Sequence, residues 1–214
     1  RGLGDVYKRQ TINIMILNRH YKKNTKKLIG LSILAVGGYG RGELAPHSDI
    51  DLLFLYQKDQ LTKHQPVIEY ILYLLWDLGL KVGHATRTRD QCLEAANDDI
   101  TIMTTLLEIR YIEGDEKLFE NFEKRLRLWI SEKPVSYFVT EKLRERDSRH
   151  KLHGATRYMV EPQIKEGKGG LRDLHTLFWI AKFAYKVRSV EEVIELGVLR
   201  VSEAKNFAAS QRFL

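Results

Sequence analysis

Cysteine is almost absent from this chain of 214 residues, with Cys92 as its one example. A single cysteine excludes an internal disulfide and any zinc site built from several thiolates. It is typical of a reducing compartment, so we expect a cytoplasmic location. The apolar stretches at 28–38 and 67–80 are interrupted or shorter than the roughly 20 residues of a membrane-spanning helix. No secretory signal follows the first basic residues, so we expect no membrane partner.

Acidic residues are scarce only at the start of the chain. The formal net charge is +7, and the first 30 residues account for all of it, with eight Lys or Arg against Asp5 alone. The remaining residues carry equal numbers of acidic and basic side chains. Binding to nucleic acid needs Lys and Arg gathered on one surface, so we expect no nucleic-acid partner.

Short apolar runs in the first half predict a small mixed sheet with helical cover. Residues 31–36, 50–56 and 81–88 read as strands, because they are short and nearly continuous in apolar character or alternate in it. Residues 67–78 carry apolar side chains at helical spacing, with Pro66 suited to a first turn. The pattern is typical of an α+β fold.

From residue 89 onward the apolar spacing is helical. It predicts helices over 90–97, 99–112, 115–131, 135–150 and 171–187. We therefore expect three parts: a basic flank (1–27), an α+β core (28–100) and a helical domain (101–214). The helical pattern at the end has no cap, so we expect that domain to be truncated and the chain to be a fragment.

One stretch between the first two strands combines glycines with a pair of acids. Its members are Gly37, Gly38, Gly40, Arg41, Ser48, Asp49 and Asp51. Asp49 and Asp51 project from the same side of a strand, and two carboxylates held together repel each other unless a cation joins them. Glycine lets backbone N–H groups approach an anion, and Arg41 adds positive charge. The pattern predicts a site for a metal-bound nucleoside triphosphate.

Two other phosphate motifs do not fit this stretch. A P-loop needs a Gly-Lys-Ser/Thr end, and the stretch contains no lysine. A dinucleotide fingerprint needs a third glycine where Glu43 stands, and an acidic residue about 20 positions later. A tight turn followed by two solvated aspartates remains the plain structural alternative.

At this point the sequence resembles a known group of enzymes. Gly37-Gly-x-Gly-Arg41 followed by Asp49-x-Asp51 resembles the signature of the DNA polymerase beta-like nucleotidyltransferase superfamily. The longer strings 35–53, 75–84 and 161–175 are similar to the bacterial protein-PII uridylyltransferase family. The resemblance runs from about Leu28 to the end of the sequence.

The resemblance implies transfer of UMP from UTP to a tyrosine of the PII nitrogen-regulatory protein, with release of pyrophosphate. By the same resemblance, Asp49 and Asp51 would hold two Mg²⁺ ions, and the glycines with Arg41 and Ser48 would contact the nucleotide. The family's uridylyl-removing domain carries a His-Asp motif. No histidine here precedes an aspartate, so we expect that domain to be absent from this segment.

One departure concerns a third carboxylate, which the superfamily usually places on the next strand and which 81–87 lacks. Glu161 and Asp173 are the candidates, beside a second glycine cluster. Possible supporting residues of the site are Glu161, Lys165, Gly169, Gly170, Arg172 and Asp173. The structural alternative for this glycine cluster is a capped helix start that docks the helical region. His84 on the third expected strand could also face the site.

Two rival functions stay open. Glutamine synthetase adenylyltransferase has similar motifs, and the motif alone does not choose between UTP and ATP. A nucleotide-binding regulatory module without turnover would also explain the missing third acid.

Overall fold

The computed structural model describes residues 28–42, 48–154, 164–187 and 190–198, with isolated positions between 200 and 209. Its elements in chain order are β1 (Leu31–Ala35), α2 (Gly37–Arg41), β2 (Ile50–Tyr56), α3 (Leu61–Asp77), β3 (Val82–Thr88), α4 (Arg89–Asp98), α5 (Ile100–Leu106), β4 (Arg110–Gly114), α6 (Glu116–Ser131), α7 (Val135–Gly154), α8 (Leu171–Tyr185) and α9 (Val190–Glu195). The chain divides into two compact units, of which the first ends at Trp129 and the second begins at Ile130.

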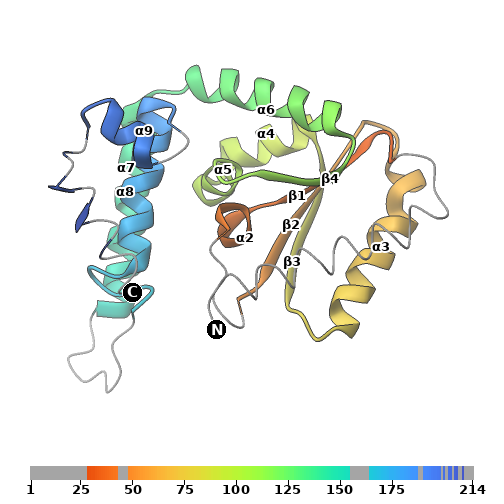
Figure 1. Ribbon diagram of the computed structural model, residues 1–214, viewed down its shortest axis with the longest axis horizontal. Helices are drawn as coiled ribbons and strands as arrows, with labels where there is room; N and C mark the ends of the chain where they lie inside the picture. Colours follow the sequence, from red (N-terminus) through yellow and green to blue (C-terminus); the bar gives the residue numbers. More distant parts are fainter. Residues whose placement is uncertain are drawn as a thin grey trace. The chain divides into compact units, whose positions relative to one another are not determined.

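The first unit contains a four-stranded sheet with the order β3-β2-β1-β4. Strand β1 pairs antiparallel with both β2 and β4, and β2 pairs parallel with β3. Helix α3 lies against one face of the sheet, and α4 and α5 lie on the other (Figure 1). The mixed sheet with helical cover confirms the expected α+β class.

Strict alternation along the central strands builds the core. Every second residue of β1 and β2 packs with the inner face of α3 in one buried cluster. Its strand members are Leu31, Ile33, Ala35, Ile50, Leu52, Phe54 and Tyr56, and its helix members are Tyr39 of α2 and Ile68, Ile71, Leu72 and Leu75 of α3. By the same alternation, Asp51 belongs to the face of β2 that points away from α3.

The structure corrects three local expectations. The glycine-rich stretch forms the short helix α2 rather than only a turn. Helix α3 begins at Leu61, so Pro66 lies inside the helix and not in its first turn. The helix expected over 99–112 ends at Leu106, and β4 follows it. Pairing with the open edge of β1 therefore outweighs the helical spacing of that segment.

The second unit contains α7, α8 and α9. Helices α7 and α8 run antiparallel, because Phe138 contacts Phe183 while Arg149 contacts Asp173. The two phenyl rings are fully buried and stack in parallel with 4.1 Å between their centroids. A division by compactness does not define a family's domains, so the bounds 1–27, 28–100 and 101–214 stay predictions.

Candidate nucleotide and metal site

The two acids of the glycine-rich stretch lie where β2 begins. Asp49 directly precedes the strand and is exposed, whereas Asp51 is its second residue and is partly buried. The backbone N–H of Val36 donates to the carbonyl oxygen of Asp51 at 3.0 Å, which joins the end of β1 to the start of β2. The acids thus adjoin the segment that leads into α2.

The carboxylate of Asp51 lies between two glycines. A Cβ on Gly37 would lie 3.0 Å from Oδ2 of Asp51, and a Cβ on Gly83 would lie 2.6 Å from Oδ1. Gly83 is the residue of β3 that pairs with Asp51 in the parallel register. No pattern in the sequence points to Gly83, because the strand pairing that places it beside Asp51 is not visible in the sequence.

Gly40 is packed against backbone from another element. A Cβ on this residue would lie 1.8 Å from the carbonyl oxygen of Glu108, so α2 can approach the end of α5 only with glycine at this position. The N–H of Gly40 donates to the carbonyl oxygen of Val36 at 2.9 Å. Gly40 therefore has a packing role, and its N–H group is already used within α2.

Arg110 holds the C-terminal end of α2. Its Nη2 donates to the carbonyl oxygen of Tyr39 at 2.9 Å, and its Nε donates to that of Gly40 at 3.2 Å. Gly42 then ends the helix in the left-handed conformation, with φ of 78°. Arg41 and Ser48 are both partly buried, and residues 43–47 lie outside the described residues.

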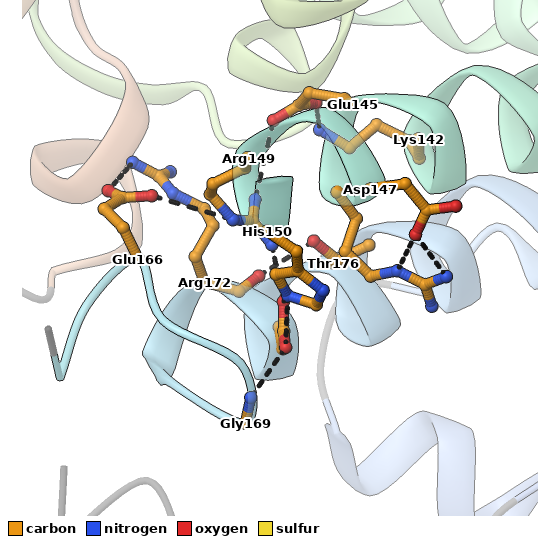
Figure 2. Close-up of polar contacts among 11 residues, drawn as sticks. Lys142, Glu145, Asp147, Arg149, His150, Glu166, Gly169, Arg172 and Thr176 are labelled. Atoms are coloured by element: carbon orange, nitrogen blue, oxygen red, sulfur yellow. Dashed lines mark hydrogen bonds and ion pairs between the residues drawn. The ribbon is translucent and has the colours of Figure 1, made fainter. Parts of the chain in front are cut away.

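A second group of charged residues lies within the second unit, between α7, α8 and the loop before α8 (Figure 2). Asp173 is its centre: it accepts from Arg149 at 2.5 Å, from the N–H of Gly169 at 2.9 Å, and it contacts Nε2 of His150 at 2.9 Å. Burial tends to raise the pKa of Asp173, but these hydrogen bonds outweigh it and hold the pKa below its ordinary value. Glu161 lies outside the described residues.

The backbone N–H groups of the glycine cluster before α8 are bonded to carbonyl oxygens of the same segment. The N–H groups of Gly170, Leu171, Arg172 and Asp173 donate to the carbonyl oxygens of Gly167, Ile164, Lys165 and Gly170, each at 3.0 Å. These donors of the helix start are thus already bonded. The arrangement is that of a capped helix, which was the structural alternative for this motif.

His84 lies away from the acids. It is exposed on β3, where alternation places it on the face opposite to Gly83, and its ring lies 6.3 Å from that of Trp76 on α3 in an edge-on contact. The expectation that His84 could face the site is therefore wrong.

Comparison with known proteins assigns the first half of the chain. Residues 17–106 match the family model described as "Nucleotidyltransferase domain". This segment is a nucleotidyltransferase domain. Residues 137–214 match the model described as "GlnD PII-uridylyltransferase".

Curated relatives extend the match over both segments. The chain is 53% identical over 184 residues, or 86% of its length, to the "bifunctional uridylyltransferase/uridylyl-removing enzyme" of two Caulobacter vibrioides strains, NA1000/CB15N and ATCC 19089. It spans about a fifth of the length of these relatives, since the match covers 20% of each. A crystal structure of a toxin–antitoxin pair with AMP-PNP matches 64% of the chain at 20% identity, with a TM-score of 0.35.

The acids of the nucleotidyltransferase domain fit a divalent cation. Mg²⁺ prefers oxygen ligands, and proteins bind it through one or two carboxylates together with water and substrate phosphates. Asp49, directly before β2, and Asp51, the second residue of β2, are two such carboxylates at the start of one strand. Within the described ranges, no group of three or more His, Cys, Asp or Glu side chains is placed to hold a metal ion. Two acids completed by nucleotide phosphates are the arrangement that these residues support.

None of the helices in the described part of the chain is both long enough and apolar enough to span a membrane.

Proposed function

We propose that this chain transfers UMP from UTP to a tyrosine of a PII signalling protein and releases pyrophosphate. The observation that carries the proposal is the 53% identity over 184 residues to proteins named uridylyltransferase/uridylyl-removing enzymes. The match of 137–214 to the PII-uridylyltransferase family supports the same reaction and the same partner. We propose the transfer of UMP but not its removal, and we propose a cytoplasmic location.

In the proposed reaction the tyrosine oxygen attacks the α-phosphorus of UTP. A new phosphorus–oxygen bond forms, the bond from the α-phosphorus to the bridging oxygen breaks, pyrophosphate leaves, and the phenolic proton passes to solvent. Asp49 and Asp51 would hold two Mg²⁺ ions, which neutralise charge on the triphosphate when bound. Gly37 and Gly38 would approach the phosphates through their backbone, and Arg41 and Ser48 would add polar contacts.

The remaining residues have weaker support in the geometry. Gly40 would contribute by fixing α2 against α5, as its packing indicates. Lys165, Gly169, Gly170, Arg172 and Asp173 take part in hydrogen bonds that shape the loop before α8 within the second unit. A supporting role at the site is proposed for them on the resemblance alone. Glu161 is proposed with them on the resemblance alone.

Transfer of label from nucleotide to purified PII tests the proposal. With the full chain and Mg²⁺, UTP labelled at the α-phosphate should label PII. UTP labelled at the γ-phosphate should not, because that phosphate leaves with pyrophosphate. Labelling from ATP in place of UTP would overturn the choice of uridylyl transfer and favour an adenylyltransferase.

Neutral variants of the two acids test the residue assignment. Asp49→Asn and Asp51→Asn should each lower the rate at least about 100-fold, since a metal clamp contributes several kcal/mol to the transition state. Asp59→Asn is the matched control: it removes an exposed carboxylate just beyond the other end of β2, where φ is 65° and asparagine is tolerated. Transfer that survives in both site variants would show that the assignment of the acids is wrong.

A further inference from the structure

Strand β3 passes directly beside the carboxylate of Asp51. In the parallel pairing of β2 with β3, Asp51 is matched to Gly83. A Cβ on Gly83 would lie 2.6 Å from Oδ1 of Asp51, which is closer than carbon and oxygen atoms that are not bonded can approach. The carboxylate therefore occupies the space that a side chain at position 83 would fill.

The backbone of Gly83 does not itself require glycine. The glycines with positive φ include Gly37, at 57°, but not Gly83. Glycine inside a strand costs roughly 0.5–1 kcal/mol relative to alanine, because it loses more conformational freedom on folding. Among the described residues other than its chain neighbours, Asp51 alone comes within 4 Å of a Cβ at position 83, and the space for its carboxylate gives a physical reason for glycine there.

We propose that Gly83 is a positioning residue for the metal-binding carboxylate of Asp51. The inference rests on the proposed function, in which Asp49 and Asp51 hold the cation of the nucleotide. Without a side chain at position 83, Oδ1 of Asp51 can lie across β3 while Oδ2 stays near Gly37. The space at Gly83 thus sets the direction in which Asp51 presents its oxygens.

The chemistry of Mg²⁺ makes this direction important. Mg²⁺ demands near-ideal octahedral geometry at about 2.0–2.1 Å, so a carboxylate that is rotated away binds it poorly. Asp51 has a short, rotatable side chain, which a methyl group at position 83 can turn aside with little effect on the fold. Residues that orient metal ligands typically change metal affinity about 10–100-fold when they are substituted.

Binding of Mn²⁺ in the presence of α,β-methylene-UTP tests the inference on the full chain, with unbound Mn²⁺ measured by electron paramagnetic resonance. We expect Gly83→Ala to weaken Mn²⁺ binding about 10–100-fold while its thermal unfolding midpoint stays the same or rises. Gly79→Ala is the matched control. Gly79 has φ of 74°, and apart from its chain neighbours no described residue lies within 4 Å of an added Cβ, so this variant should lose stability and keep its Mn²⁺ affinity.

Two further variants separate this inference from the proposed function. Parental Mn²⁺ affinity in Asp51→Asn would overturn the metal site itself. Loss of binding in Asp51→Asn with parental binding in Gly83→Ala would overturn the role of Gly83 alone, as would a Gly83→Ala chain that no longer folds. The double variant should bind no more weakly than Asp51→Asn, because Gly83 acts through the carboxylate that this change removes.

Discussion

Arg110 on β4 donates a hydrogen bond of 2.9 Å to the carbonyl oxygen of Tyr39 at the end of α2. The guanidinium also lies 5.2 Å from the centre of the Tyr39 ring. Strand β4 thereby holds in place the short helix that contains the proposed phosphate-binding glycines. The helix predicted over 99–112 includes Arg110, so no pattern in the sequence points to this residue as a partner of α2.

Replacing Arg110 should therefore loosen α2. Arg110→Ala removes the charged donor to the carbonyl oxygens of Tyr39 and Gly40, of which that of Tyr39 still accepts from the N–H of Gly42 at 3.2 Å. We expect the variant to lower the free energy of unfolding by about 1.5–3 kcal/mol. Urea unfolding of the parent and the variant measures the difference. Arg127→Ala, which removes an exposed ion pair with Glu123 on α6, should change it by less than about 1 kcal/mol. Equal unfolding midpoints for the two variants would contradict the role of Arg110.

The central strands could be predicted from the sequence, but the contacts around the acids could not. The strand predicted over 50–56 is confirmed. A short, nearly continuous apolar run is typical of a strand that is buried on both faces, and the residues of β2 are buried in this way. Gly83 could not be predicted as a site residue, because its place beside Asp51 depends on the register between β2 and β3. That register is set by packing in the folded protein. The same limit applies to β4, because its partner strand β1 lies far from it in the sequence.

The second glycine cluster shows a different limit. Gly169 and Gly170 are among the possible supporting residues of the nucleotide site, but the structure bonds the donors of the helix start to carbonyl oxygens of the preceding loop. Composition shows that such backbone N–H donors are present. It does not show whether other groups of the protein already accept their hydrogen bonds. The contacts of Asp173 with Arg149 and His150 likewise depend on how α7 packs against α8.

Asp173 should make the second unit sensitive to acid. Its pKa lies below the ordinary value of 3.8, because the hydrogen bonds to its carboxylate outweigh the effect of burial. A carboxyl with a lowered pKa stabilises the fold above that ordinary value, and the contribution is lost as the pH falls through the lowered pKa. The fluorescence of Trp179, which is buried in the same unit, should therefore report a steep loss of stability below about pH 4.

Variants identify the carboxyl responsible for this acid sensitivity. Asp173→Asn should unfold more easily at pH 7 and show a flatter dependence on pH below about 4. Asp147→Asn removes an exposed carboxylate on α7 that pairs with Arg146, and solvent screening should make its effect much smaller. An unchanged acid slope in Asp173→Asn would place the acid sensitivity elsewhere.

Lys142 on α7 is a charged side chain that is almost fully buried. It is 2% exposed, it forms an ion pair with Glu145, and its ammonium lies 4.5 Å from the centre of the Trp179 ring. Burial lowers the pKa of Lys142 although Glu145 acts in the opposite direction. The charged form is therefore less stable in the folded protein than in water.

Lys142→Met should stabilise the second unit at pH 7. Methionine keeps the length of the side chain and its contact with Trp179 but removes the buried charge, and Glu145 is 33% exposed and can be hydrated. We expect a gain of about 1 kcal/mol or more in the free energy of unfolding. The parent should approach the variant as the pH rises toward the ordinary lysine value of 10.5, because its folded state releases the proton first. Lys151→Met, at an exposed position of α7, should show neither effect, and a destabilised Lys142→Met would mean that the ion pair and the Trp179 contact together outweigh the cost of burial.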